Sequence, residues 1–388
     1  MTNITGTVAP GWEAVRTAFA YNLAETEEVG AGVAVYHRGV KVVDLVGGFF
    51  DDARTTPYDE STLQLVFSTT KGIVAIALAM LVEKGLLRYD DQVATHWPEF
   101  AEHGKGEATV AQLISHQCGL STVDGPLTLA EALDWDTITA RMAATKPDWP
   151  IGTAHGYHAL TYGFLAGELI RRVDPKHRTP GRFVADEIVA PLGVELWIGL
   201  PGALEPRVSP IIDAPPPEDP AVVEMMAMMM GPDTRGGKAL FLNGVFGPGT
   251  FNTAAVHAAE VPAANGISNA RSLAKIYAAT LGPVDGVQLL HDEVRNIART
   301  CVTPDGEGDL CLIVPTTFGM GFMTNGPFTT FAGPGSYGHP GAGGSVALAQ
   351  PERELAFAYV MNRSASNLAG DLRAQRLIDA ATATIDAL

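Results

Sequence analysis

The segment VFSTTKGIVAIALAMLV, residues 66–82, contains the two features on which the interpretation of this chain depends. Its first part places Ser68 and Lys71 three residues apart, and its second part, residues 73–82, has no charged or polar side chain. This apolar run is about half of the roughly 20 residues that a membrane span needs. Because the run is apolar on every face, it predicts a buried central helix that ends near Gly85.

The spacing of Ser68 and Lys71 predicts a nucleophile and its base, because residues three apart share one face of a helix. A serine hydroxyl becomes a good nucleophile only when a neighbouring group accepts its proton. A lysine can accept it when burial and the positive end of a helix lower the pKa of its ammonium group. A second Ser-x-x-Lys pair, Ser272 and Lys275, lies in an amphipathic pattern, and we interpret it as a solvated helix face.

The composition indicates a folded, acidic protein. The 388 residues are 46% hydrophobic and 18% charged, which predicts a large core and argues against disorder. The formal net charge of -17 argues against nucleic acids and anionic membranes as partners. Cys118, Cys301 and Cys311 give no disulfide framework, and the first residues show no secretory signal. We therefore expect a cytoplasmic protein.

Strand-like patterns lie near both ends of the chain, and helical patterns fill the middle. Two β-rich runs around Arg38 and Gly39 predict a hairpin, and further runs follow within residues 316–363. We expect an α/β (α+β) fold in which N- and C-terminal strands form one antiparallel sheet flanked by helices, with an inserted helical domain. The expected divisions are residues 1–75 and 311–388 for the sheet domain and 76–310 for the helical domain, with the active site between them.

Several helices are expected outside the central one. A helical pattern covers residues 10–28, another follows Asn269 as its cap, and a last one runs from about Asn367 to the end. The methionine-rich segment 213–230 predicts a proline-rich loop followed by a packed helix. A lid that lines a substrate site is the alternative interpretation of this segment.

Two later segments can complete a site around Ser68. Tyr157 precedes a helical pattern, and a phenol beside a lysine can carry a proton to and from a serine. The glycine-rich segment 337–344 allows a substrate carbonyl to approach the backbone N–H groups closely. Each feature by itself fits a structural role equally well, as a packed tyrosine or a turn.

Taken in order along the chain, these motifs resemble the serine β-lactamase-like superfamily, which includes class C β-lactamases, D-alanyl-D-alanine peptidases and family VIII carboxylesterases. The resemblance implies that Ser68 is the acylated nucleophile and that Lys71 and Tyr157 are the general base and acid. It also implies an oxyanion hole formed by the N–H groups of Ser68 and Ala342. The segments that carry the resemblance are residues 66–72, 83–100, 110–120, 147–163, 265–276 and 339–344.

Two departures from the pattern of the superfamily concern the substrate. The Tyr-x-Asn motif is Tyr-His-Ala at residues 157–159, and Lys-Thr-Gly is His-Pro-Gly at residues 339–341. The groups that contact the amide and the carboxylate of lactams and peptides are therefore missing. A site without polar partners for a substrate group loses selectivity for it, so the resemblance is greatest to the family VIII carboxylesterases.

We therefore predict a serine hydrolase that cleaves small-molecule carboxylic esters, short-chain or aryl, through an acyl-enzyme on Ser68. The alternatives are an amide or lactam hydrolase, an acyltransferase on the same fold, and a binding protein without activity. Neither a zinc motif nor a nucleotide-binding motif is present, so we expect no metal and no cofactor. The residues expected to contact substrate are His339, Gly341, His158, Trp149 and Phe246.

Overall fold

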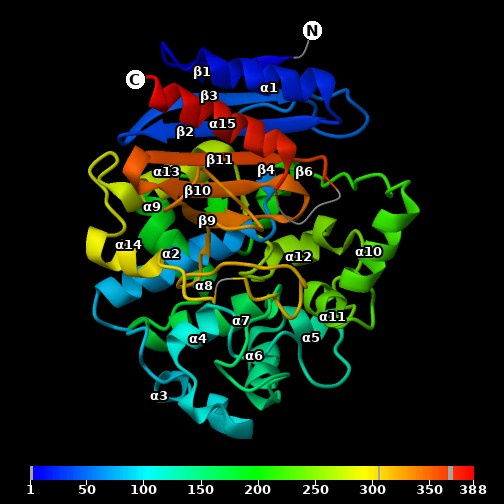
Figure 1. Cartoon of the computed structure of the whole chain (residues 1–388), viewed down its shortest axis with the longest axis vertical. Coiled ribbons are helices and arrows are strands. Elements are labelled where there is room, and N and C mark those ends of the chain that lie inside the picture. The colour runs from blue at the N-terminus through cyan, green and yellow to red at the C-terminus, as the bar shows by residue number, and fades with distance from the viewer. Residues whose placement is uncertain (1–2, 305, 366–369) are drawn as a thin grey trace.

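The computed structural model describes residues 3–304, 306–365 and 370–388. It contains a seven-stranded antiparallel sheet, with strand order β1-β3-β2-β11-β10-β9-β8, at the end of the molecule where both termini lie (Figure 1). The first three strands come from the N-terminal part and the other four from the C-terminal part, which confirms the predicted fold class. The strands are β1 (Ile4–Val8), β2 (Gly30–His37), β3 (Val40–Gly48), β8 (Met323–Thr324), β9 (Tyr337–Pro340), β10 (Val346–Gln350) and β11 (Leu355–Met361).

The central strands β2 and β11 are buried on both faces, because helices cover each side of the sheet. Helices α1 (Glu13–Glu25) and α15 (Leu372–Asp386) cover one face (Figure 1) and share a core with Val33 and Val35 of β2. Helix α13 (Ala270–Leu281) covers the other face and packs on β2, β10 and β11. The alternation of side chains along β2 divides its residues between these two cores.

Helix α2 (Thr69–Glu83) lies between the sheet and the helices of the other region (Figure 1). It contacts β9, α7 and α14, so the residues from Thr69 to Leu81 are buried on every face, as the apolar run predicted. No helix among the described residues is both long and apolar enough to cross a membrane. The other helices are α3 (Val93–His96), α4 (Val110–Ile114), α5 (Leu129–Leu133), α6 (Trp135–Ala144), α7 (Thr161–Val173), α8 (Pro180–Val184), α9 (Ala190–Leu192), α10 (Pro220–Met230), α11 (Arg235–Phe241), α12 (Ala254–Ala258) and α14 (Asp292–Ala298).

Four short strands form a second sheet, in the order β5-β7-β4-β6. Strand β4 of this sheet directly precedes α2 in the chain. The sequence did not predict it, because strands of two or three residues have too little periodicity to detect. The division into domains at residues 75 and 310 remains a prediction, although α13, inside the range 76–310, packs on the large sheet. The strands are β4 (Leu63–Leu65), β5 (Leu196–Trp197), β6 (Val208–Ser209) and β7 (Ile267–Ser268).

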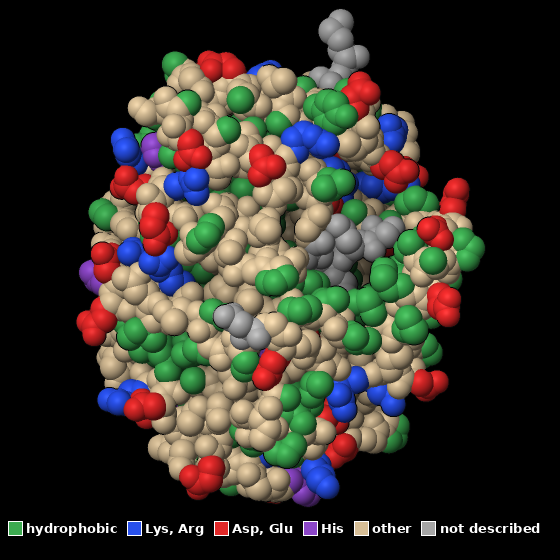
Figure 2. Space-filling view, in the orientation of Figure 1, with side chains coloured by type: hydrophobic (Ala, Val, Ile, Leu, Met, Phe, Trp, Pro, Cys, Tyr) green, Lys and Arg blue, Asp and Glu red, His purple; other side chains and the backbone are tan. Residues whose placement is uncertain are grey.

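The expected packing of the methionine-rich helix is wrong. Helix α10 forms within the expected segment, but none of its residues is buried. Val223, Met225 and Met228 expose 48%, 49% and 62% of their surface. Hydrophobic side chains gather on the molecular surface over α10 and α11 (Figure 2). An apolar sequence favours packing only where another element covers it, and none of the described elements covers these side chains.

The interpretation of Ser272 and Lys275 as a solvated face is also wrong. Ser272 is buried, and its hydroxyl accepts a hydrogen bond from the Glu195 N–H at 3.0 Å. Lys275 donates to the Leu192 carbonyl at 2.8 Å and pairs with Asp285. The segment after α9 covers this side of α13, which the sequence of α13 alone could not reveal. The expected start of the last helix at Asn367 lies outside the described residues.

Candidate active site

Ser68 lies in a tight turn between β4 and α2, at the N-cap position of the helix, and its hydroxyl makes no capping hydrogen bond. The preceding residue, Phe67, has a positive φ of 43°, a conformation that costs a non-glycine residue energy and is concentrated at functional sites. Hydrogen bonds on both sides hold the turn: the Thr70 hydroxyl donates to the Phe67 carbonyl at 2.6 Å and accepts from the Gly266 N–H at 2.9 Å. The turn therefore fixes the Ser68 hydroxyl at the start of a buried helix.

Lys71 is fully buried, and its Nζ lies 2.9 Å from the Ser68 Oγ. Nζ also donates to the carbonyls of Ala159 at 2.7 Å and Ala263 at 2.9 Å. Burial lowers the pKa of the Lys71 ammonium well below its usual value. A neutral amine has two N–H groups and one lone pair. In this neutral form Nζ can donate to both carbonyls and keep its lone pair for the Ser68 hydroxyl, whose proton it can then accept.

The phenol of Tyr157 lies beside this pair, with the Lys71 Nζ 4.8 Å from its ring centre. Burial raises the pKa of Tyr157, and the neighbouring Ser68 hydroxyl lowers it by a smaller amount. The phenol is therefore protonated at neutral pH and can give a proton to a leaving oxygen. The backbone N–H of Tyr157 donates to Asp309 at 2.9 Å, and its ring stacks against Phe318.

The residues expected to form the oxyanion hole, Ser68 and Ala342, line the same two cavities. Among the described residues, no group of the protein accepts a hydrogen bond from the N–H of Ser68 or of Ala342. Ala342 begins a short 3-10 turn. The Ser345 hydroxyl, just after this turn, donates to the Val66 carbonyl at 2.9 Å and so ties the turn to the segment that precedes Ser68. A side chain at Gly341 would lie 2.3 Å from that carbonyl, so glycine is required for this approach. The two unpartnered N–H groups are available for an oxyanion, and their role as an oxyanion hole remains a prediction.

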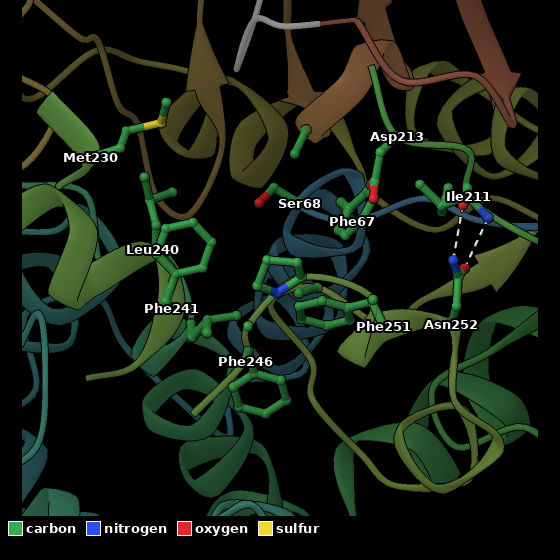
Figure 3. Close-up of a pocket in the computed structure, with 17 residues that line it drawn as sticks. Phe67, Ser68, Ile211, Asp213, Met230, Leu240, Phe241, Phe246, Phe251 and Asn252 are labelled. Atoms are coloured by element: carbon green, nitrogen blue, oxygen red, sulfur yellow. Dashed lines mark hydrogen bonds between the residues drawn. The ribbon is translucent and has the colours of Figure 1, made fainter. Parts of the chain in front are cut away.

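A pocket of about 260 Å³ opens on one side of Ser68 and Ala342 (Figure 3). Its walls are apolar and aromatic, with Phe241, Phe246 and Phe251 among them. Asp213 is the one side chain with a formal charge among the described residues that line this pocket. Asn252 and Ile211 line the pocket on the side opposite Met230 (Figure 3). The Asn252 side chain accepts a hydrogen bond from the Ile211 N–H and donates one to the Ile211 carbonyl.

A second, much smaller cavity of about 30 Å³ lies on another side of Ser68 and Ala342. Tyr157 and His339 line this cavity and do not line the large pocket. Its remaining walls are apolar and come from Leu240, Leu312, Met323, Phe328 and Pro340. Ser68 thus lines both a large apolar pocket and a narrow cavity that Tyr157 and His339 also line.

The structure does not bring Trp149 or His158 into either cavity. Trp149 lines a separate groove on the surface. His158 is buried behind the site, where its Nε2 accepts from the Leu120 N–H at 2.8 Å and lies 3.3 Å from the Cys118 sulfur. Phe246 and His339 lie where substrate contact was expected, and Gly341 supports the oxyanion turn.

The sequence analysis missed several residues of the site. The carbonyls of Ala159 and Ala263 that bind Lys71 are backbone groups, and nothing in the identity of alanine indicates such a role. Asp213 and Leu240 line the cavities from segments assigned to a loop and to no element. Phe67 could have been found, since a large apolar residue beside a nucleophile commonly forms a pocket wall.

Comparison with known proteins agrees with this geometry. The family model described as Beta-lactamase matches residues 15–382. The chain belongs to the beta-lactamase family. It is 34% identical over 375 residues to the esterase/beta-lactamase LipL of Mycobacterium tuberculosis (strain ATCC 25618 / H37Rv), a match that covers 94% of this chain and 84% of that protein.

Solved structures give the same assignment. A crystal structure of a penicillin-binding protein homologue from Caulobacter crescentus superposes with a TM-score of 0.88 at 40% identity, covering 98% of this chain and 100% of the other. A family VIII carboxylesterase superposes with a TM-score of 0.87 at 35% identity, with the same coverage. Family and fold together assign the protein to the serine hydrolases of the β-lactamase fold.

Proposed function

We propose that this protein is an esterase that hydrolyses neutral carboxylic esters through an acyl-enzyme on Ser68. The observation that carries the proposal is the position of the buried Lys71 Nζ, which lies within hydrogen-bond distance of two backbone carbonyls and of the Ser68 hydroxyl. In this mechanism Lys71 accepts the serine proton while Oγ attacks the ester carbonyl. The N–H groups of Ser68 and Ala342 stabilise the negative oxygen that forms.

The leaving alkoxide then takes a proton from Tyr157, and the proton held by Lys71 restores the phenol. Water attacks the acyl-enzyme by the same route, so the acid is released and Ser68 regains its proton. The high pKa of a buried phenol suits this step, because an alkoxide is a strong base and accepts a proton from it readily.

The large pocket supports an ester with an apolar acyl group of modest size. Its aromatic walls favour short-chain or aryl groups, and its volume of about 260 Å³ is near the lower end for small-molecule sites. The carboxylate of Asp213 at its edge disfavours substrates that carry a carboxylate, as β-lactams and peptide C-termini do. The names of LipL and of the family VIII carboxylesterase agree with ester hydrolysis.

The proposal is tested by a panel of p-nitrophenyl esters, the matching anilides and a chromogenic cephalosporin, each assayed with wild type and with Ser68→Ala. We expect the highest kcat/KM for uncharged short or aryl esters, and a loss of about 10³-fold or more in Ser68→Ala. Ser272→Ala is the matched control, because it changes the other Ser-x-x-Lys pair. Higher kcat/KM for the anilides or the cephalosporin would favour an amide or lactam hydrolase, and binding without turnover would favour a binding protein.

A further inference from the structure

The imidazole of His339 is buried at 1% exposure and uses only one of its nitrogens within the protein. Its Nδ1 lies 2.7 Å from the Pro340 carbonyl oxygen, which can only accept, so Nδ1 carries the hydrogen. Nε2 is then the unprotonated nitrogen with a lone pair. It is buried and has no hydrogen-bond partner among the described residues. A buried acceptor without a partner is costly, and at a site of this kind it indicates a ligand.

The small cavity beside Ser68 has the size and the polar groups for a water molecule. Its volume of about 30 Å³ accommodates one water, which needs at least about 10–15 Å³. The polar side chains that line it are those of Ser68, Tyr157 and His339, and Ala342 lines it as well. A bound water needs two to four polar partners, and this cavity offers that number in otherwise apolar surroundings.

We propose that His339 Nε2 binds the water that hydrolyses the acyl-enzyme, and that the small cavity is the site of this water. The proposal rests on the esterase function proposed above. The acyl group occupies the large pocket, and the acyl carbon is bonded to Ser68 Oγ between the two cavities. Water held in the small cavity therefore lies next to the carbon that it must attack, on the side where Tyr157 lies.

The groups around the water divide its two protons between them. One O–H donates to His339 Nε2, which fixes the orientation of the oxygen lone pair toward the acyl carbon. The other proton leaves to the Lys71–Tyr157 pair as the new C–O bond forms. When the bond from carbon to Ser68 Oγ breaks, that proton returns to Oγ. The products are a carboxylic acid and free serine, so atoms and charges balance.

His339 orients the water and does not take its proton. Burial lowers the pKa of His339 well below its usual value, so its imidazole is a weaker base than the Lys71–Tyr157 pair and stays neutral over the working pH range. An ester oxygen has no hydrogen to donate to Nε2. Loss of His339 should therefore slow the reaction of water with the acyl-enzyme and leave attack on the ester nearly unchanged.

Stopped-flow assays with a p-nitrophenyl ester separate the two steps, because nitrophenol release in the first turnover reports acylation, and the steady-state rate that follows a burst reports deacylation. We expect His339→Leu to acylate within about threefold of wild type while its steady-state rate falls about 10- to 100-fold. Intact mass spectrometry should then show acyl-enzyme accumulating on His339→Leu. His339→Gln retains a side-chain acceptor and should recover part of the steady-state rate without changing the pH dependence of kcat.

His291→Leu is the matched control, since it makes the same substitution at an exposed histidine that lines neither cavity, and it should reproduce the burst and the steady state of wild type without accumulating acyl-enzyme. Equal losses of burst rate and steady-state rate in both folded His339 variants would overturn the inference. An unchanged deacylation rate in folded His339→Leu would overturn it as well. If wild type itself forms no Ser68 adduct, the proposed esterase function fails, whereas normal wild-type turnover with unaffected His339 variants refutes only the water site.

Discussion

At the scale of single residues, the state of Lys71 determines what the site can do. Its spacing from Ser68 was evident from the sequence, and so was a buried helix that would lower its pKa. The two carbonyls that bind its N–H groups come from positions 88 and 192 residues further along the chain. No pattern in a single sequence indicates backbone contacts over such separations. The sequence therefore predicted the pair, and the structure supplies the carbonyls to which Nζ can donate while it keeps its lone pair for the serine.

The pH dependence of acylation follows from Lys71. Protonation of Nζ removes the lone pair, so kcat/KM should fall as the pH decreases through the pKa of this group in the folded protein. Burial lowers that pKa well below 10.5, so we expect activity to extend to lower pH than an ordinary lysine would allow. Lys71→Arg places a guanidinium there that stays protonated at accessible pH, and it should lose about 10³-fold or more of kcat/KM.

The measurement is a pH–rate profile with a p-nitrophenyl ester for wild type and Lys71→Arg. Lys275→Arg serves as the control because it makes the same change in the other Ser-x-x-Lys pair, away from both cavities. A Lys71→Arg variant with activity within tenfold of wild type would contradict the role of an unprotonated Lys71.

At the scale of elements, close packing behind α2 holds the Ser68–Lys71 pair in place. Gly72 follows Lys71 directly, and a β-carbon there would lie 1.9 Å from the Tyr277 hydroxyl of α13. That hydroxyl is buried and has no hydrogen-bond partner among the described residues. The Tyr277 side chain thus reaches α2 at the residue beside the base, and α13 in turn packs on the sheet.

This contact predicts a rescue between two substitutions. Gly72→Ala should lower the free energy of unfolding by about 1–3 kcal/mol through overpacking. Tyr277→Phe alone should be close to neutral, because it removes a buried hydroxyl that has no partner. The double variant should recover most of the loss, since the atom in closest contact is gone. Chemical denaturation of wild type, both single variants and the double variant measures the coupling between the two positions. If the losses in free energy of unfolding simply add, the contact with the Tyr277 hydroxyl is not the reason that position 72 requires glycine.

The elements also show which parts of the fold a sequence can predict. The apolar run of α2 and the alternating strands β2 and β11 are long enough for their periodicity to identify them. The exposed helix α10 was predicted as a helix but not as an unpacked one, because composition does not reveal whether a neighbour covers it. Burial of Ser272 was missed for the converse reason, since a segment distant in sequence covers it.

At the scale of the whole molecule, a buried charge cluster joins the two ends of the chain. Arg373 of α15 pairs with Glu28, which precedes β2, at 3.2 Å, and with Asp371 at 2.7 Å. The Tyr359 hydroxyl of β11 donates to Glu28, and Arg373 also donates to the Gly343 carbonyl in the oxyanion turn at 3.0 Å. The association of N- and C-terminal segments was predictable from their strand patterns, whereas this charged connection to the site was not.

The cluster predicts a pH-dependent stability. Burial raises the pKa of Glu28 from 4.5 to about 7, so between these values the folded protein keeps a proton that the unfolded chain has lost. The free energy of unfolding should therefore decrease as the pH rises through this window, by at most about 1.4 kcal/mol per pH unit from this group. Glu28→Gln should lack that decrease, because its side chain does not titrate.

Urea denaturation at several pH values between 4.5 and 7.5 compares wild type with Glu28→Gln. Glu27→Gln is the control, as Glu27 is the exposed neighbour of Glu28 and makes the same change in charge. Parallel stability curves for wild type and Glu28→Gln across the window would show that Glu28 is already ionised in the folded protein at pH 4.5.

The central claim is that Ser68 is an activated nucleophile, and covalent trapping tests it most directly. The folded protein is treated with an aryl phosphonate ester, which reacts with activated serines, and is then analysed by intact mass and peptide mapping. The account predicts one adduct, on the peptide that contains Ser68, and none in Lys71→Arg over the same time. An adduct on another serine, or none on the folded wild-type protein, would contradict it.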